Sequence, residues 1–350
     1  MNTIYEKVDA KNIDMAVIEK AGSIIKEGGL VAFPTETVYG LGGDALSGGS
    51  SKKIYEAKGR PSDNPLIVHI ARIEDLEVIA KDIPPAAKIL SGRYWPGPLT
   101  MIFRKKDIVP KETTGGLDTV AVRFPSHPVA KALIEASGGF IAAPSANISG
   151  RPSPTNGKHV KEDMDGRIDM MIDSGSCDIG LESTIIDMTV DPPMMLRPGY
   201  VNEAMLKDVL GEVSKDPAVF GEAKENVQPK APGMRYRHYA PKGKLSIVSG
   251  DSMNVIRFIK ERISEKDKGK RIAVIACHAD TDEFKDADLV CDAGSRDDEI
   301  GIASRLFDML RRCDDENIDE IYSEEFDTPD LGLAIMNRLI RAAGHSIINV

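Results

Sequence analysis

The chain has 350 residues, of which 41% are hydrophobic and 29% charged, and its net charge is −10. This balance is typical of a folded globular protein, and no apolar run approaches the roughly 18 residues that a membrane-spanning helix needs. The polar N-terminus lacks the apolar core of a signal peptide, so we expect a cytoplasmic protein with no membrane partner. The four cysteines are scattered along the chain, which argues against a zinc site.

The first two thirds of the chain mix predicted helices and strands without a strict alternation. Apolar residues at helical spacing predict a helix over residues 13–26, closed by Gly28 and Gly29. Further helices are predicted over residues 51–57, 73–80, 84–92 and 128–137. Short apolar runs predict strands over residues 30–33, 66–70, 99–103, 119–123, 140–143 and 185–188. The mixture predicts an α/β fold.

The pattern weakens from about residue 211, and a proline-bounded basic and aromatic stretch over residues 231–241 predicts an extended linker. Strands over residues 244–248, 271–277 and 318–322 then alternate with helices over 254–263, 302–312 and 331–343. This alternation predicts a small parallel sheet covered by helices. We therefore expect domains at residues 1–211 and 244–350, joined by a linker at residues 212–243.

The charge is unevenly spread between these regions. From residue 244 to the end, 15 basic residues stand against 23 acidic residues. Because an acidic surface repels phosphate backbones, we do not expect this part of the chain to hold RNA by itself. The first part is near neutral and has its lysines and arginines in loops, which suits a small anionic ligand better than a long polyanion.

The segment over residues 34–43 is predicted to be a polar loop at the end of a strand. Its side chains include Thr35, Glu36 and Thr37, and ligands of open α/β sheets bind at this position. The alternative is that a threonine only caps a following helical turn.

The segment that follows carries Lys58 and Arg60 on either side of a glycine, in a loop stiffened by two prolines. Preorganised cations of this kind suit a polyphosphate; the alternative is a solvated surface loop. The small polar residues over 142–154 could line a phosphate or ribose pocket or form a simple turn-rich loop. His69 lies inside a predicted strand, where a hydrogen-bonded core histidine is the commoner finding.

Several sequence signatures of other enzymes are missing. The chain has no G-x-x-x-x-G-K-[ST] motif, and its glycines after the first strand do not have dinucleotide-binding spacing. It also lacks H-E-x-x-H and G-x-S-x-G. The residues alone therefore predict a ligand-binding α/β protein with an anion-binding pocket.

Seven ordered motifs and the linker resemble one known family. The motifs are FPTETVYGLG, AKGRPSDNPLIVHI, WPGPLT, TVAVRFPSHP, APSANISGRPSPT, ESTIID and LRPG, and the linker contains APGMRYRHYAP. The motifs resemble the YrdC-like domain, and the whole chain resembles the long, two-domain form of the threonylcarbamoyl-AMP synthase family. The resemblance implies a twisted, open mixed sheet with helices, a linker that folds over the active site, and a small Rossmann-like parallel α/β domain.

The resemblance also implies the reaction. A nucleotidyltransferase of this family joins L-threonine, bicarbonate and ATP, with Mg²⁺ on the phosphates, and releases diphosphate and water. A separate transferase complex then modifies adenosine 37 of tRNAs that read codons beginning with A. A weak contact of this chain with tRNA is a further expectation.

Residue roles follow from the same resemblance. The residues implied to contact L-threonine are Thr37, His69, Arg123, Ala143 and Ser183. Those implied to contact ATP are Arg60, Asn64, Thr119, Ser145, Ser153, Arg197 and Tyr236. Lys58 and Arg60 would stabilise charge in the reaction, and no protein nucleophile and no protein ligand to a metal are expected.

Two other functions stay open at this point. An RNA-binding module is one, because YrdC-like domains offer a positively charged concave face, although the acidic chain and the short basic loops favour the enzyme. A carbamoyltransferase-type subunit is the other, because related domains occur in hydrogenase-maturation proteins. Those proteins carry zinc-finger-like cysteine motifs that this chain lacks.

Overall fold

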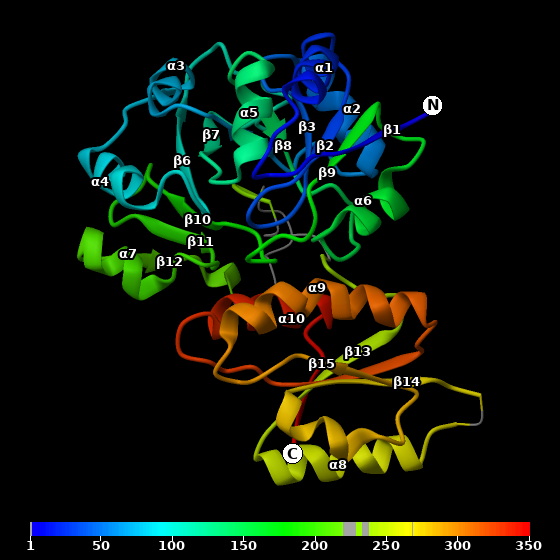
Figure 1. The fold of residues 1–350 in the computed structure, drawn as a ribbon. Coiled ribbons are helices and arrows are strands. Elements are labelled where there is room, and N and C mark those ends of the chain that lie inside the picture. Colours follow the sequence, from blue (N-terminus) through cyan, green and yellow to red (C-terminus); the bar gives the residue numbers. More distant parts are fainter. Residues whose placement is uncertain (1, 220–228, 233–237, 268) are drawn as a thin grey trace. The chain divides into compact units, whose positions relative to one another are not determined.

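Two units built on separate β-sheets form the computed structural model, which describes residues 2–219, 229–232, 238–267 and 269–350 (Figure 1). The first unit comprises Met1–Ser149, Ser153–Asp178 and Glu182–Arg235. The second comprises Gly150–Pro152, Ile179–Leu181 and Tyr236–Val350. The boundaries expected at residues 211 and 243 stay a prediction.

The sheet of the first unit is mixed. Its strands follow the order β1-β9-β2-β3-β8-β4-β7-β6-β10-β11-β12, and β5 pairs with β6. The strands are β1 Ile4–Lys7, β2 Val31–Phe33, β3 Gly40–Asp44, β4 Ile67–His69, β5 Ala80–Lys81, β6 Leu99–Lys105, β7 Thr119–Arg123, β8 Ile141–Ala143, β9 Met170–Asp173, β10 Thr184–Asp187, β11 Met194–Arg197 and β12 Ser214–Lys215. The predicted α/β fold with a mixed sheet is confirmed.

Helices pack against this sheet through their apolar faces. Helix α1 begins after Asp14, whose carboxylate accepts a hydrogen bond from the N–H of Ala16 at 3.0 Å. Helices α1 and α5 lie side by side (Figure 1), and Ile18 of α1 and Leu133 of α5 are buried in one apolar cluster with Val31 of β2. The helical segments are α1 Met15–Lys26, α2 Gly48–Lys58, η1 Ile73–Asp75, α3 Leu76–Ile79, α4 Pro85–Tyr94, α5 Pro128–Ala136, α6 Gly157–Met164, α7 Glu203–Leu210 and η2 Pro217–Val219.

Strand β3 corrects one expectation. The predicted loop over residues 34–43 was wrong in its second half, because Gly40–Asp44 pairs with both β2 and β8. Glycine is rare in strands except where backbones approach closely. A Cβ on Gly42 would lie 2.8 Å from the side chain of Ile141 and 2.9 Å from the ring of Phe33. Glycine therefore allows β3 to pack closely against its neighbours. Its low strand propensity is the reason that the sequence predicts a loop here.

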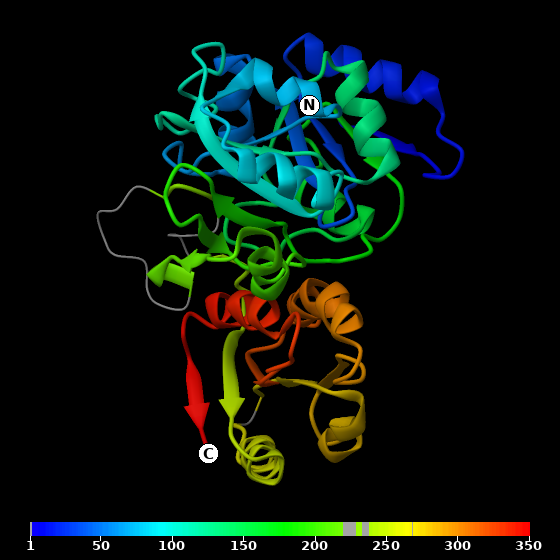
Figure 2. The same cartoon turned by 90° about the vertical axis from the view of Figure 1, so that its left-hand side faces the viewer.

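The second unit is a parallel sheet covered on both faces. Its strands follow the order β15-β14-β16-β13-β17, and every pair is parallel. Figures 1 and 2 show α8 on one face of this sheet and α9 with α10 on the other. The predicted small parallel domain is confirmed. Its elements are β13 Lys244–Ser249, α8 Ser252–Ser264, β14 Ile272–Ala276, η3 His278–Phe284, β15 Leu289–Asp292, α9 Glu299–Asp315, β16 Glu320–Glu324, α10 Gly332–Ala342 and β17 Ile347–Asn349.

Within the described residues, the helices lack the combination of length and apolar character that crossing a bilayer requires.

Candidate active site

The strand register of the first unit places three polar residues in one row across the sheet. Two of them, His69 and Arg123, are predicted site residues. His69 of β4 is paired with Arg123 of β7, and Arg123 is paired with Thr100 of β6. Residues directly opposite one another on adjacent strands project from the same face of a sheet. Thr119 lies on the same face as Arg123 but at the other end of β7, roughly 13 Å away at about 3.3 Å per residue.

Arg123 forms a buried ion pair with Glu36. Its Nη2 lies 2.7 Å from Glu36 Oε1, and the two side chains are only 5% and 7% exposed. Glu36 lies in the segment between β2 and β3, so this segment crosses to the end of β7. Among the described residues, Arg123 Nε and Glu36 Oε2 have no hydrogen-bond partner. A buried ion pair with one unsatisfied atom on each side can receive a ligand that carries both charges.

His69 is held beside this pair as a neutral imidazole. Its Nδ1 lies 3.1 Å from the carbonyl oxygen of Ile67, and its ring meets the ring of Phe33 edge-on at 6.1 Å. Burial, with a smaller contribution from the positive charge of Arg123, lowers the pKa of His69 to about 3. The interpretation of His69 as a buried, hydrogen-bonded residue is therefore correct, and its position beside Arg123 is compatible with a binding role as well.

Ser183 and Arg197 meet at the next pair of strands. Ser183 Oγ lies 2.7 Å from Thr100 Oγ1 and accepts a hydrogen bond from Arg197 Nη2 at 3.3 Å. Arg197 Nε also donates to the carbonyl oxygen of Ser183 at 3.0 Å, and Nη1 donates to that of Pro232 at 3.4 Å. Arg197 therefore joins the start of β10 to a described part of the predicted linker.

A second contact also ties the linker to this sheet. Ala231 is fully buried in an apolar cluster with Ile67, Ala121 and Ile185, and Lys230 Nζ lies 3.1 Å from Asp187 of β10. These contacts put residues 230–232 against the face that carries His69 and Arg123. Tyr236, which was predicted to contact ATP, lies outside the described residues.

Thr37 lies in a turn held by threonine hydroxyls. Thr35 Oγ1 donates to the carbonyl oxygen of Val38 at 2.7 Å and accepts from the N–H of Thr37 at 3.1 Å. The hydroxyls of Thr35 and Thr37 are 2.9 Å apart. The alternative in which a threonine caps a helix is wrong, because strand β3 follows this turn.

Lys58 and Arg60 are buried, which contradicts the alternative of a solvated surface loop. Helix α2 ends at Gly59, whose φ of 61° lets the chain turn sharply between the two cations. Lys58 Nζ donates to the carbonyl oxygens of Ser145, at 2.6 Å, and Asn147. Lys58 is 1% exposed, so the positions of its few accessible atoms are fixed by these bonds.

Arg60 is held by its own loop. Its Nε and Nη2 donate to the carbonyl oxygens of Asn64 and Pro65 at 3.3 Å and 3.2 Å. Asn64 is itself buried, and its Oδ1 has no hydrogen-bond partner among the described residues. The loop therefore presents a fixed guanidinium next to an unsatisfied amide oxygen.

The remaining predicted residues lie on neighbouring strands and loops. Ala143 ends β8, and the next turn brings Ser145 into a bridge with Gly40 at the start of β3. Ser153 is buried and its hydroxyl donates to Glu182 Oε1 at 2.6 Å, which connects it to the residue before Ser183. The predicted residues thus form two groups, one around Arg123 and Ser183 and the other around Lys58, Arg60 and Ser145.

Two protein-family models match consecutive parts of the chain. A family model described as telomere recombination, of the Sua5, YciO and YrdC group, matches residues 23–199. A model described as the C-terminal domain of threonylcarbamoyl-AMP synthase matches residues 201–344.

Individual relatives share this organisation. A protein of Pyrococcus abyssi named threonylcarbamoyl-AMP synthase is 51% identical over 334 residues, covering 95% of this chain and 96% of that protein. The protein of the same name from Bacillus subtilis is 45% identical, covering 95% of this chain and 94% of its own length. The chain belongs to the threonylcarbamoyl-AMP synthase family. The family predicted from the motifs is therefore confirmed.

A solved structure from the same family has the same fold. The crystal structure of P. abyssi Sua5 complexed with L-threonine matches with a TM-score of 0.94 and 49% sequence identity, covering 99% of this chain and 100% of that chain. The predicted two-domain form of the family, with a mixed α/β sheet and a smaller parallel domain, is confirmed by this match.

Three residues with contacts inside the site were missed as candidates. Glu36 pairs with Arg123, Thr100 meets Ser183, and Glu182 accepts from Ser153. Glu36 and Glu182 lie within motifs quoted above, next to predicted residues, and that neighbourhood was the available signal. Thr100 could not be found from local sequence, because its contact with Ser183 depends on the pairing of β6 with β10.

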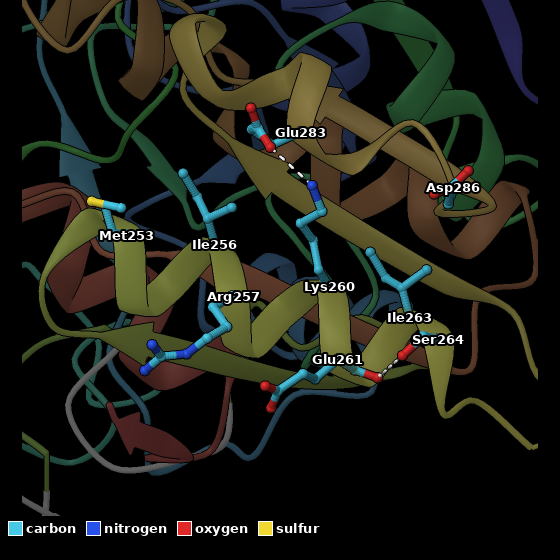
Figure 3. Close-up of a pocket in the computed structure, with 9 residues that line it drawn as sticks. All are labelled: Met253, Ile256, Arg257, Lys260, Glu261, Ile263, Ser264, Glu283 and Asp286. Carbon is cyan, nitrogen blue, oxygen red and sulfur yellow. Dashed lines mark hydrogen bonds and ion pairs between the residues drawn. The ribbon is translucent and has the colours of Figure 1, made fainter.

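A separate pocket of about 930 Å³ lies in the second unit, between α8 and η3 (Figure 3). Met253, Ile256 and Lys260 of α8 line it, and Lys260 Nζ lies 3.0 Å from Glu283 of η3 (Figure 3). None of its lining residues was a predicted site residue, so it is distinct from the candidate active site.

Proposed function

We propose that this chain is an L-threonylcarbamoyladenylate synthase, an enzyme that joins L-threonine, bicarbonate and ATP and releases diphosphate and water. The observation that carries the proposal is family membership over 95% of the chain, shared with relatives named threonylcarbamoyl-AMP synthase. The L-threonine in the P. abyssi structure supports the choice of amino acid. No specific observation favours the RNA-binding module or the carbamoyltransferase-type subunit.

We assign the group around Arg123 to L-threonine. The planar guanidinium of Arg123 suits the substrate carboxylate. Buried, neutral His69 and the Ser183 hydroxyl supply polar contacts, and Ala143 and Thr37 border the group from β8 and from the threonine turn. The burial of these residues supports a dry pocket.

We assign the second group to ATP, with Lys58 and Arg60 stabilising the charge of the phosphates. Both cations are buried and oriented by hydrogen bonds to backbone carbonyl oxygens, which supports this role because preorganised donors stabilise negative charge. The other residues assigned to ATP are Asn64, Thr119, Ser145, Ser153, Arg197 and Tyr236.

The chemistry needs no protein nucleophile. The threonine amine and bicarbonate form a carbamate, and a carbamate oxygen attacks the α-phosphorus of ATP with diphosphate as the leaving group. Catalysis then depends on holding the reactants together and on compensating charge. Both the carbamate and the adenylate are unstable in water, so we propose that the linker at residues 212–243, between domains at 1–211 and 244–350, covers the site. The contacts of Lys230, Ala231 and Pro232 support this role.

Mg²⁺ is expected to accompany ATP. Among the described residues there is no group of three or more histidine, cysteine, aspartate or glutamate side chains that could hold a metal ion. Because Mg²⁺ in ATP-using sites is held largely by substrate phosphates, the phosphate oxygens would supply much of its coordination.

The product would be consumed by a threonylcarbamoyl transferase complex that modifies adenosine 37 of tRNAs reading codons that begin with A. A weak contact of this chain with tRNA and a cytoplasmic location belong to the same proposal.

The test is diphosphate release from ATP, measured with and without L-threonine and with and without bicarbonate. We expect release that depends on both co-substrates. Release without L-threonine would contradict the proposed reaction. Salt-sensitive tRNA binding without ATP turnover would instead favour the RNA-binding alternative.

A further inference from the structure

The ion pair of Arg123 and Glu36 has more capacity for hydrogen bonds than the described residues use. A guanidinium carries five N–H donors, and a carboxylate can accept about four hydrogen bonds. Arg123 Nε and Glu36 Oε2 are buried, and neither has a hydrogen-bond partner among the described residues. Buried polar atoms without partners cost free energy, so a pair of them calls for a functional explanation.

The two unsatisfied atoms have opposite character. Arg123 offers donors to an anion, whereas Glu36 offers an acceptor to a cation, and Arg123 Nη2 and Glu36 Oε1 are only 2.7 Å apart. An α-amino acid carries its carboxylate and its ammonium group on one carbon atom. A buried pair of opposite charges in direct contact is therefore complementary to such a zwitterion.

We propose that Glu36 binds the ammonium group of L-threonine while Arg123 binds its carboxylate, and that Glu36 then accepts a proton from the amine. This inference rests on the proposed function and deepens it. As the N–C bond forms, the nitrogen loses two protons and its lone pair bonds to the carbon of bicarbonate. One proton goes to Glu36, and the other leaves with the hydroxyl of bicarbonate as water when the C–O bond breaks. The products are the carbamate, water and protonated Glu36.

The neighbouring titratable groups are less suited to this step. Burial raises the pKa of the Cys177 thiol, and burial lowers the pKa of His127. Burial and the charge of Arg123 hold the pKa of His69 near 3. These imidazoles are poor proton acceptors and the thiol stays protonated. Asp178 is exposed, and the buried carboxylate of Glu182 accepts a hydrogen bond from Ser153, whereas Glu36 is the carboxylate in contact with Arg123.

The test combines one variant with two ligands. Glu36→Gln keeps the size of the side chain but removes its charge. Binding of L-threonine is compared with binding of 2,3-dihydroxybutanoate, in which a hydroxyl replaces the amino group. In the wild-type protein we expect L-threonine to bind roughly 10- to 100-fold more tightly, the scale of a hydrogen bond to a charged group. In Glu36→Gln we expect the ratio of the affinity for L-threonine to the affinity for 2,3-dihydroxybutanoate to fall below about 3. We also expect kcat to fall about 10²-fold.

The matched control is Asp75→Asn. Asp75 is another buried carboxylate paired with an arginine, at 2.9 Å from Arg72, and its side chain is 6% exposed. We expect this variant to lose stability while keeping the wild-type ligand ratio and kcat. If Glu36→Gln does not fold, Glu36→Asp takes its place. It keeps a negative charge close to the ammonium group, so we expect it to keep the ligand ratio. We expect kcat to fall by at least about 10-fold, because the shorter side chain no longer has the geometry for proton transfer.

Equal loss of affinity for both ligands in Glu36→Gln would mean that Glu36 only positions Arg123, and would overturn the proposal. An unchanged ratio, or an unchanged kcat, would overturn it as well, as would loss of the ligand ratio in Glu36→Asp. These outcomes differ from failure of the proposed function, which would appear in the wild-type protein as diphosphate release that does not depend on L-threonine and bicarbonate.

Discussion

The two ends of the candidate site hold their cations in different ways. Arg123 is paired with the carboxylate of Glu36 inside the protein. Lys58 and Arg60 instead donate to backbone carbonyl oxygens of Ser145 and Asn64. All three cations are fixed and nearly or fully buried, but the contacts that orient them differ.

The difference matches the ligands assigned to the two ends. A neutral ion pair offers both signs of charge within a few ångströms and is suited to a zwitterion. Carbonyl oxygens orient a cation in a fixed direction, and preorganised cations suit triphosphate oxygens. The comparison predicts that substitutions at the two ends will separate the kinetic constants for L-threonine from those for ATP.

Arg123→Ala should have the largest effect. Removing one partner of a buried ion pair leaves an uncompensated charge, which costs about 3–5 kcal/mol. We therefore expect kcat/KM for L-threonine to fall by about 10³-fold or more and the unfolding temperature to fall as well. Steady-state kinetics with each substrate varied in turn will measure this.

The control for that variant is Arg93→Ala, which removes an exposed arginine from α4. It should leave kcat/KM within about twofold of the wild-type value, since surface substitutions rarely matter. If Arg123→Ala raised the KM for ATP as much as that for L-threonine, the division of the site into two ends would be wrong.

Arg60→Ala should have the next largest effect, at the other end. Loss of one preorganised charge-stabilising donor lowers kcat/KM by about 10²–10³-fold. Because Arg60 is assigned to the phosphates, its loss should leave the Kd for L-threonine near the wild-type value. Calorimetry will measure the Kd for L-threonine, and a turnover assay will measure kcat/KM for ATP. Near wild-type turnover would exclude Arg60 from the site. The reference is Lys52→Ala, which removes an exposed lysine from helix α2, the helix that precedes Arg60.

The sequence predicted much of this site because its residues lie at strand ends and in short motifs. Thr119 to Arg123 and Lys58 to Asn64 could be assigned to strands and loops from local pattern alone. The contacts between them could not, because they depend on strand order. Glu36 contacts Arg123 although it lies 87 residues earlier in the chain. A local sequence pattern cannot predict a contact between residues so far apart in sequence. Strand β3 escaped prediction because its glycines, which its tight packing requires, are typical of loops.

His69 gives the amino-acid end a contribution to stability that depends on pH, because burial lowers the pKa of its imidazole. Its pKa is about 3 in the folded protein and about 6.5 in the unfolded chain. Below pH 6.5 the unfolded chain therefore binds more protons, and stability falls as the pH falls toward 3. Between pH 6.5 and 5, His69 alone should cost about 2 kcal/mol.

Urea unfolding of the wild-type protein and of His69→Gln at both pH values will measure this contribution. The wild-type protein should lose about 2 kcal/mol more than the variant. Parallel losses in the two proteins would mean that His69 is protonated in the folded state, which contradicts its assignment as a neutral residue beside Arg123.

Thr100→Val should have the smallest effect, and it tests the position of a single residue, Ser183. The Thr100 hydroxyl lies 2.7 Å from Ser183 Oγ, and both side chains are buried. Valine keeps the shape and removes the hydrogen bond, at a cost of about 1 kcal/mol. If Ser183 contacts L-threonine, the KM for L-threonine should rise about fivefold. The KM for ATP should rise less, because Arg197, which is assigned to ATP, keeps its hydrogen bond to the carbonyl oxygen of Ser183.

Thr113→Val is the matched control for this last variant. Its hydroxyl is equally buried and lies 2.8 Å from Ser51 Oγ, but the pair belongs to neither assigned group. The Thr113 hydroxyl also donates to the carbonyl oxygen of Ala45 at 2.9 Å, so Thr113→Val should lose at least as much stability as Thr100→Val. A change in the KM for L-threonine that appears only in Thr100→Val therefore reports the position of Ser183. An equal change in both variants would assign the effect to packing. The amino-acid end would then depend on Arg123 and Glu36 rather than on the row of polar groups that extends to Ser183.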